Sequence, residues 1–304
     1  MSAKPGLRAW LSSYSGQKHL ITVMFLLIPV ILLLLFTAIP AVQMLIYSFQ
    51  DRNMLRMNAW VGLDNYKTVF TDTAYISTLQ TSLYYFVGSF LQIIIALVIA
   101  YILCSNLRAK NVFKGILFFP FMMNGIAVSL IFRRFFQKGD GITNTEGTLN
   151  AILEVLGGEP RRWLMDSPVM ANICLVFVSM WRHIGFDIIM FIGALMAVPS
   201  DLGEAASIDG AGAWQRFKYI AFPIIRPIIA LQMILAVRGA ISVFEIPYII
   251  TSGRFGTNTF VIQTMSTAFE SRKVGLGAAM AIVLLAIIIV ITIIQKAYFR
   301  EREK

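Results

Sequence analysis

Six apolar stretches of this chain are each long enough to cross a lipid bilayer as a helix. A crossing of roughly 30 Å of hydrocarbon takes about 20 residues of α-helix. The six stretches lie at residues 20–49, 83–103, 112–132, 169–198, 219–250 and 276–299. In lipid each backbone polar group needs a partner, which a helix supplies within one segment. The sequence therefore predicts an all-α integral membrane protein with six transmembrane helices in one membrane domain over residues 20–299, between terminal segments 1–19 and 300–304.

The composition indicates lipid, not water, as the main surroundings. Apolar residues make up 58% of the chain, charged residues 14%, and the mean hydropathy is +0.73. A soluble domain carries about a quarter charged residues, so the composition argues against a water-soluble globule and excludes a disordered chain. In a soluble protein the net charge of +10 would suggest nucleic acid, but here it fits basic loops that orient a membrane protein. We expect membrane lipid as a partner and no nucleic acid.

The distribution of Lys and Arg predicts that both termini lie in the cytoplasm. The segments that would then be inner carry a higher density of basic residues, whereas acidic residues nearly cancel the basic charge of the outer ones. The inner segments are 1–19, 104–111, 199–218 and 295–304, and the outer ones are 50–82, 133–168 and 251–275. The first apolar stretch is too long for the core of a signal peptide, so we expect an uncleaved anchor in the cytoplasmic membrane.

The largest predicted outer segment, 133–168, contains one short helical pattern. Residues Asn150–Leu156 read as a short amphipathic helix, and Gly157 and Gly158 would end it. We therefore expect a loop with some structure of its own on the outer side.

The motifs that most enzymes need are absent from the sequence. It has no Gly-rich phosphate-binding loop ending in Lys-Ser/Thr, no Gly-x-Ser-x-Gly elbow and no His-Glu-x-x-His. Its two cysteines and two histidines have no metal-ligand spacing. We expect no metal, no cofactor and no catalysis in this chain, and a membrane enzyme is the least favoured interpretation.

The predicted inner segment 199–218 has the pattern of two short helices joined by a turn. Pro199 would end the preceding helix, Ser200 or Asp201 would cap the next, and Glu204 could reach back to the cap. Asp209 and Gly210 turn the chain, and residues 214–220 form a second amphipathic piece. Such a pair could lie beneath the membrane as a knob that another protein grips. Local chemistry alone would equally allow a capped loop helix without a partner.

The full string in this segment resembles the signature of the membrane subunits of ATP-binding-cassette importers. It runs Glu204-Ala205-Ala206, three residues, Gly210, nine residues, and then Ile220-x-x-Pro223. Its continuation through Phe222 to Pro227 is similar to the carbohydrate-uptake branch, which includes the large membrane subunit of maltose and glycerol-phosphate importers. Phe222 stands where that branch often has Leu. Weaker similarities to the branch are Val61–Tyr66, Gly141–Asn144, and Trp181 with Gly185.

This resemblance implies a fold, partners and an activity. The fold would be the type I importer (MetI-like) permease fold, and the chain would be half of a pore that pairs with a second, homologous permease subunit. Two separate ATPase subunits would bind ATP and Mg beneath the pore, and an extracytoplasmic sugar-binding protein would deliver a sugar or oligosaccharide. The ATPase-coupling residues implied are Glu204, Ala205, Ala206, Asp209, Gly210, Ala211 and Gly212.

Charged residues in the middle of predicted spans mark a possible substrate pathway. A charge at the centre of a bilayer costs at least about 2.5–3.5 kcal/mol, so it must face a cavity or a partner. Helical spacing places Ser179, Arg182, His183 and Phe186 on one face of the fourth span, and Arg238, Ser242 and Glu245 on one face of the fifth. The family's sugar-contacting positions fall near the same faces. The predicted pathway residues are Ser179, Arg182, His183, Phe186, Asp187, Leu235, Arg238, Ser242 and Glu245.

Several alternatives remain open at this point. Arg182 could simply pair with Asp187, and Arg238 with Glu245, or these charges could pair with a sister subunit. Within the same family, Arg182 and Arg238 could indicate an anionic sugar or glycerol phosphate as cargo. A secondary transporter or channel that works without an ATPase is a further, less favoured possibility.

Overall fold

The computed structural model describes residues 13–53, 56–104, 109–139 and 147–300. Gly141–Asn144, most of segment 1–19 and nearly all of segment 300–304 lie outside these residues. The described elements, in chain order, are α2 (Tyr14–Leu33), η1 (Leu34–Ala38), α3 (Ile39–Tyr47), β1 (Gln50–Asn53), β2 (Arg56–Trp60), α4 (Asp64–Thr71), α5 (Thr73–Leu103), α6 (Lys110–Met122), α7 (Gly125–Phe135), α8 (Thr148–Val155), α9 (Pro168–Met196), α10 (Ser200–Ile208), α11 (Ala213–Arg216), η2 (Phe217–Ala221), α12 (Phe222–Ile241), α13 (Glu245–Thr251), α14 (Phe260–Met265), η3 (Ser266–Glu270) and α15 (Val274–Arg300).

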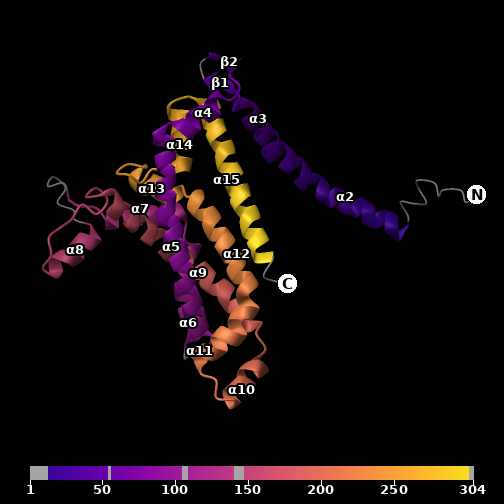
Figure 1. Cartoon of the computed structure of the whole chain (residues 1–304), viewed down its shortest axis with the longest axis vertical. Helices are drawn as coiled ribbons and strands as arrows, with labels where there is room; N and C mark the ends of the chain where they lie inside the picture. Colours follow the sequence, from indigo (N-terminus) through magenta and orange to yellow (C-terminus); the bar gives the residue numbers. More distant parts are fainter. Residues whose placement is uncertain (1–12, 54–55, 105–108, 140–146, 301–304) are drawn as a thin grey trace, which may run out of the picture.

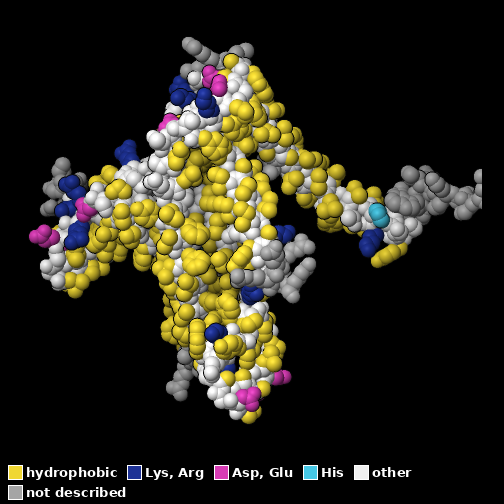
Figure 2. Space-filling model, viewed as in Figure 1, with side chains coloured by type: hydrophobic (Ala, Val, Ile, Leu, Met, Phe, Trp, Pro, Cys, Tyr) yellow, Lys and Arg dark blue, Asp and Glu magenta, His cyan; other side chains and the backbone are white. Residues whose placement is uncertain are grey.

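The elements are arranged along one long axis (Figure 1). The β1–β2 hairpin, α4 and α14 lie at one end, and α10 and α11 lie at the other. Within the described residues, five helical segments are long and apolar enough to cross a membrane, and a sixth crossing results if α6 and α7 count as one. In Figure 2, apolar side chains cover the middle of the molecule, whereas charged ones gather near the hairpin, on the arm that carries α8, and at the α10 end.

The first predicted span forms one helical segment that diverges from the rest of the chain (Figure 1). It runs over Tyr14–Tyr47, and none of its most apolar window is buried. Phe25 is 78% exposed and Phe36 is 75% exposed. Only its α3 end packs against α15. An apolar surface of this extent is covered by lipid or by another protein.

The hairpin end is fastened by the residues of the Val61–Tyr66 stretch. Gly62 takes the left-handed conformation (φ +59°) that a side chain disfavours. The Asn65 side-chain amide donates to the carbonyl oxygens of Ser48 and Gln50, at 2.9 and 3.0 Å. The Tyr66 hydroxyl lies 2.6 Å from the Ser48 hydroxyl. This stretch therefore joins the end of the first span to α4.

Helices α5, α9 and α12 form the central bundle. Their buried apolar side chains include Ala96, Ile188, Phe191 and Ile225. Helix α6 packs along α9 at Gly185, whose Cα lies so close to the Leu117 carbonyl that no side chain would fit. Helix α15 packs against α4, α14 and α12 on the other side.

The third predicted span is a bent pair of helices and not one straight helix. Helices α6 and α7 meet at 93° around Met123 and Asn124. The Asn124 side chain accepts hydrogen bonds from the N–H groups of Ile126 and Ala127, which starts a new helix. With 13 residues, α6 is about 20 Å long and cannot cross roughly 30 Å of hydrocarbon by itself.

The fifth predicted span is also divided, but not where its first two prolines stand. A π-helical turn, η2, precedes Pro223, and the helix continues through Pro227 to Ile241. Residues 242–244 leave the helix, and α13 begins at Glu245. The predicted second short helix at 214–220 is therefore the start of this long segment and not a separate piece.

The outer segment contains the helix that the sequence predicts. Helix α8 covers Thr148–Val155, and Gly157 follows it with φ +82°. The Asn150 side chain is buried; its amide donates to the carbonyls of Gln137 and Arg161, and its oxygen accepts from the Trp163 indole at 2.7 Å. These bonds link α8 to the chain before it and after it through one buried polar side chain.

Candidate functional site

A cavity of about 460 Å³ lies between α5, α9, α12 and the start of α13. Eight of the nine predicted pathway residues line it: Ser179, Arg182, His183, Phe186, Asp187, Leu235, Ser242 and Glu245. Most of the side chains that helical spacing had grouped therefore line one cavity. Their role in moving a substrate remains a prediction.

Arg238 is the predicted pathway residue that does not line the cavity. It lies in the last turn of α12, its side chain is exposed, and its carbonyl accepts a hydrogen bond from the Ser242 hydroxyl at 2.7 Å. The predicted helical face of Arg238, Ser242 and Glu245 requires an unbroken helix. The helix ends after Ile241, so these three residues do not share one helical face, and the role of Arg238 in the pathway stays a prediction.

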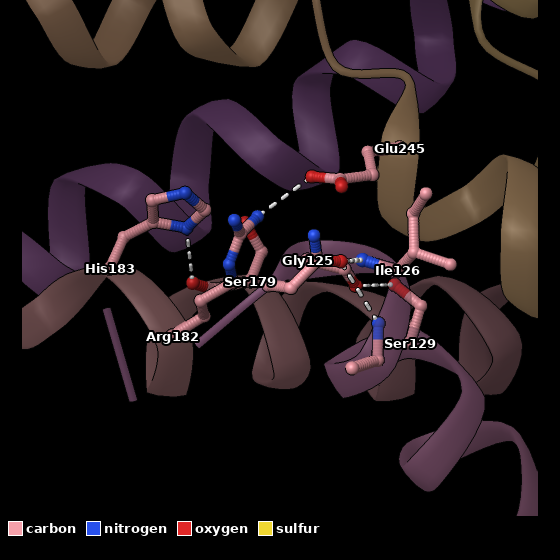
Figure 3. Close-up of polar contacts among 9 residues, drawn as sticks. Gly125, Ile126, Ser129, Ser179, Arg182, His183 and Glu245 are labelled. Carbon is pink, nitrogen blue, oxygen red and sulfur yellow. Dashed lines mark hydrogen bonds and ion pairs between the residues drawn. The ribbon is translucent and has the colours of Figure 1, made fainter. Parts of the chain in front are cut away.

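Arg182 and Glu245 form an ion pair across the cavity wall, with 2.8 Å between Nη1 and Oε2 (Figure 3). Neither of the predicted pairs, Arg182 with Asp187 or Arg238 with Glu245, is present among the ion pairs of the described residues. The Glu245 carboxylate also lies directly against Gly125, where a Cβ would overlap it. The pair therefore joins α9 to α13 and holds α13 against the start of α7.

Asp187 is held by two neutral side chains instead of a cation. Gln92 of α5 donates to Oδ2 at 2.6 Å, and Gln232 of α12 donates to Oδ1 at 2.7 Å. All three side chains are at least nine-tenths buried. One carboxylate thus connects the three helices of the central bundle at the cavity wall.

Aromatic side chains close another part of the wall. Phe121 of α6 stacks on Phe186, with 5.0 Å between ring centroids, and meets the His183 ring edge-on at 6.2 Å. The His183 Nδ1 lies 2.8 Å from the Ser179 carbonyl oxygen, one turn back on α9 (Figure 3). The cavity therefore offers an aromatic face beside hydroxyl, amide and charged groups.

The spacing of charged residues gave no sign of the polar side chains that α5 and α12 contribute to the cavity. Tyr85, Ser89 and Gln92 line the cavity from α5, and Gln232 lines it from α12. The first three are spaced by four and three residues, which is one helical face. A search for polar residues, and not only charged ones, inside the apolar stretch would have found them.

Replacing Asp187 should destabilise the bundle. In Asp187→Ala two buried amide groups lose their acceptor, and each unsatisfied group costs about 1–3 kcal/mol. We expect a loss of roughly 2–4 kcal/mol of stability, seen as a lower melting temperature of the purified protein in detergent. Ser242→Ala is the matched control, because within the described residues that hydroxyl bonds to the nearby Arg238 carbonyl and joins no second element, so its loss should change the melting temperature little. Equal melting temperatures of wild type and Asp187→Ala would show that this carboxylate does not hold the three helices together.

The segment after α9, which consists of α10, α11 and the turn between them, forms an exposed knob at the end of the molecule opposite the hairpin (Figure 1). Gly210 (φ +79°) ends α10, and the Ala211 N–H donates to the Ala206 carbonyl at 2.8 Å, as in a Schellman motif. The Tyr101 hydroxyl of α5 donates to the Ala213 carbonyl at 3.0 Å. The knob is therefore ordered and tied to the bundle.

The predicted cap of this knob was wrong. Helix α10 starts at Ser200 with Pro199 in the cap position, and no side chain caps it. Asp201 lies in its first turn, and Glu204 is exposed and does not reach back. The large apolar side chains of Ile208 and Trp214 in the knob are also exposed, by 87% and 70% of their surface. Of the other predicted coupling residues, Ala206 and Ala211 are half-buried, while Ala205, Asp209, Gly210 and Gly212 are exposed.

The fold and the site together define a class of protein. Apolar helices that can cross a membrane surround a cavity whose wall carries charged, hydroxyl and amide groups among apolar ones, and an ordered knob projects beyond them. Within the described residues no group of three or more His, Cys, Asp or Glu side chains could hold a metal ion. These features are those of a multi-pass membrane protein with a cavity between its helices.

Comparison with known proteins gives the family. Residues 92–304 match the family described as "Binding-protein-dependent transport system inner membrane component". The chain is 30% identical over 279 residues to the multiple sugar-binding transport system permease protein MsmF of Streptococcus mutans, covering 89% of this chain and 92% of that protein. It is 31% identical over 295 residues to the arabinooligosaccharides transport system permease protein AraP of Bacillus subtilis, covering 95% and 90%. The chain therefore belongs to the family of binding-protein-dependent transport system inner membrane components.

Solved structures support the fold. A chain of a bacterial ABC transporter involved in the import of the acidic polysaccharide alginate matches with a TM-score of 0.79 and 19% identity, over 95% of this chain and 98% of that chain. The same kind of transporter, in complex with an alginate pentasaccharide-bound periplasmic protein, matches with a TM-score of 0.80. The predicted all-α importer permease fold is thus confirmed. At 19% identity the likeness carries no information on cargo.

Proposed function

We propose that this chain is the permease subunit of an ATP-binding-cassette importer for a sugar or oligosaccharide. The observation that carries the proposal is the cavity, whose wall combines hydroxyl, amide and aromatic groups, the set that a sugar needs for orientation and stacking. Names of relatives support the same cargo class, since MsmF and AraP are both sugar permeases. The substrate pathway would run through the residues that line this cavity.

The knob is the proposed contact with separate ATPase subunits. Glu204 and the apolar side chains of Ile208 and Trp214 form an exposed patch on an ordered element, and such a patch suits a protein partner. Gly210 shapes the turn, and the short side chains of Ala205 and Ala206 allow close approach. ATP-driven movement of the partner would shift the bundle between inward-open and outward-open populations. ATP and Mg would be bound by the ATPase subunits, and the second half of the pore by another permease subunit.

The proposed orientation places the knob and both termini in the cytoplasm. The start of α2 and the end of α15 both lie far from the hairpin that joins their opposite ends (Figure 1). The hairpin, α4 and the arm that carries α8 would then face outward, where the extracytoplasmic binding protein docks. The basic residues near the predicted inner ends agree with this orientation.

Purification and transport assays test the proposal together. A tag on this chain should recover an ATPase and a second membrane protein in mild detergent, and the reconstituted complex with its binding protein should take up an oligosaccharide only when ATP is supplied. Uptake by the purified chain alone, driven by an ion gradient, would overturn the proposal in favour of a secondary transporter.

A further inference from the structure

Three ionised side chains line the cavity within the described part of the chain: Arg182, Asp187 and Glu245. The His183 ring also lines the cavity, with its Nδ1 at hydrogen-bond distance from the Ser179 carbonyl oxygen. Both oxygens of Asp187 are occupied by amide donors. Asp187 is therefore fixed in place, and Arg182 and Glu245 are the charged groups whose pairing a cargo can change.

In this pair the carboxylate is more accessible than the cation. The Glu245 side chain is 41% exposed, whereas that of Arg182 is 18% exposed. Glu245 cannot move away from the pair toward α7, because Gly125 backs its carboxylate closely. The Arg182 Nε is buried and bonds to nothing in the described structure. The guanidinium thus retains donor capacity beyond its bond to Glu245.

We propose that Glu245 is a specificity-determining residue, which makes uncharged sugars the cargo of this cavity and keeps out sugars that carry carboxylates. The proposal rests on the proposed function and narrows its substrate class. A uronate entering the cavity would find the one guanidinium already paired and two carboxylates, Glu245 and Asp187, close by. Like charges brought together without water disfavour binding, which is how a site rejects a close analogue.

An uncharged sugar meets no such penalty. Its hydroxyl groups could bond to Ser89, Ser179 and the exposed oxygen of Glu245, and a ring could lie on Phe186. In Glu245→Gln the ion pair is lost and the guanidinium of Arg182 becomes available to an incoming carboxylate. Arg182 would then favour the ligand that Glu245 had excluded.

The test uses the assembled importer, purified through a tag on this chain and held in nanodiscs without its binding protein. The two probes are trigalacturonate and its fully methyl-esterified form, which has the same rings and no charge. We measure the binding of each probe by ligand-observed NMR. Wild type should prefer the ester, and Glu245→Gln should raise the acid-to-ester affinity ratio by about tenfold, equivalent to roughly 1.4 kcal/mol.

Matched variants separate charge from structure. Glu245→Asp should keep the wild-type ratio, and Arg182→Gln/Glu245→Gln should lose the gain because the guanidinium is gone. Glu154→Gln, on the arm outside the cavity, should leave the ratio as in wild type. Each variant must first recover the same ATPase as wild type.

Two results would overturn the inference alone: a wild type that binds acid and ester equally, or an unchanged ratio in Glu245→Gln while the ester still binds. Failure of wild type to bind either trimer would overturn the inference together with the proposed sugar pathway.

Discussion

Reversing the charge of Glu204 should strongly reduce ATP-driven uptake while the permease remains folded in the membrane. Within the described residues, the Glu204 side chain forms no hydrogen bond or ion pair, so folding does not depend on its charge. A buried charged contact at the centre of an interface is worth about 2–3 kcal/mol, so Glu204→Lys should reduce coupled transport by about 30- to 150-fold. The measurement is uptake by the reconstituted importer, beside its rate of ATP hydrolysis.

Glu154→Lys is the control for this reversal. It makes the same chemical change on α8, on an exposed side chain far along the chain from the knob. It should leave recovery of the ATPase subunits, and their rate of ATP hydrolysis without the binding protein, close to wild type. Normal uptake by Glu204→Lys, at equal protein levels, would contradict the proposal that the knob couples this chain to the ATPase subunits through Glu204.

Gly210→Val tests the shape of the knob instead of its charge. A Cβ at Gly210 would meet nothing within 4 Å, so the substitution acts through the backbone alone. Holding a β-branched residue at φ +79° costs on the order of 1–2 kcal/mol, and the turn between α10 and α11 should open. We expect this variant to insert normally and to hydrolyse ATP without matching uptake.

Apolar runs located the crossings but did not set their ends or directions. Helix α5 starts ten residues before the apolar run does, because Asp72 caps it and a helix can continue beyond the hydrocarbon. Asn124 lies inside an apolar run, yet its side chain starts a new helix at 93° to the previous one. An apolar composition shows that a segment can lie in lipid. It does not show the bend between α6 and α7, which depends on the hydrogen bonds of a single side chain, Asn124.

The site could be predicted where one helix carries it and not where elements meet. Ser179, Arg182, His183 and Phe186 share one face of α9, so spacing alone grouped them. The partner of Arg182 is Glu245, 63 residues away on a different element. The partners of Asp187 are two neutral glutamines, which a search for opposite charges passes over. Pairs between residues far apart in the chain depend on how the helices pack. Neither the helical spacing of residues nor the sign of their charges predicts such pairs.

Packing of α6 on α9 at Gly185 gives the largest expected effect on folding. A Cβ there would overlap the Leu117 carbonyl and lie 2.8 Å from the Phe118 Cα, both backbone atoms that cannot rotate aside. Gly185→Leu should therefore separate the two helices and remove Phe121 from its place against Phe186 and His183. Overpacking of a close contact costs about 1–3 kcal/mol and sometimes more, so we expect little assembled permease.

Gly193→Ala on the same helix is the matched control for Gly185→Leu. No atom lies within 4 Å of its added Cβ, and Ala favours a helix over Gly by about 1 kcal/mol. It should assemble at least as well as wild type. The measurement is the amount of monodisperse complex recovered through the tag, with its melting temperature. If Gly185→Leu assembled as well as Gly193→Ala, α6 could not lie against α9 as described, and the aromatic wall of the cavity would lose its support.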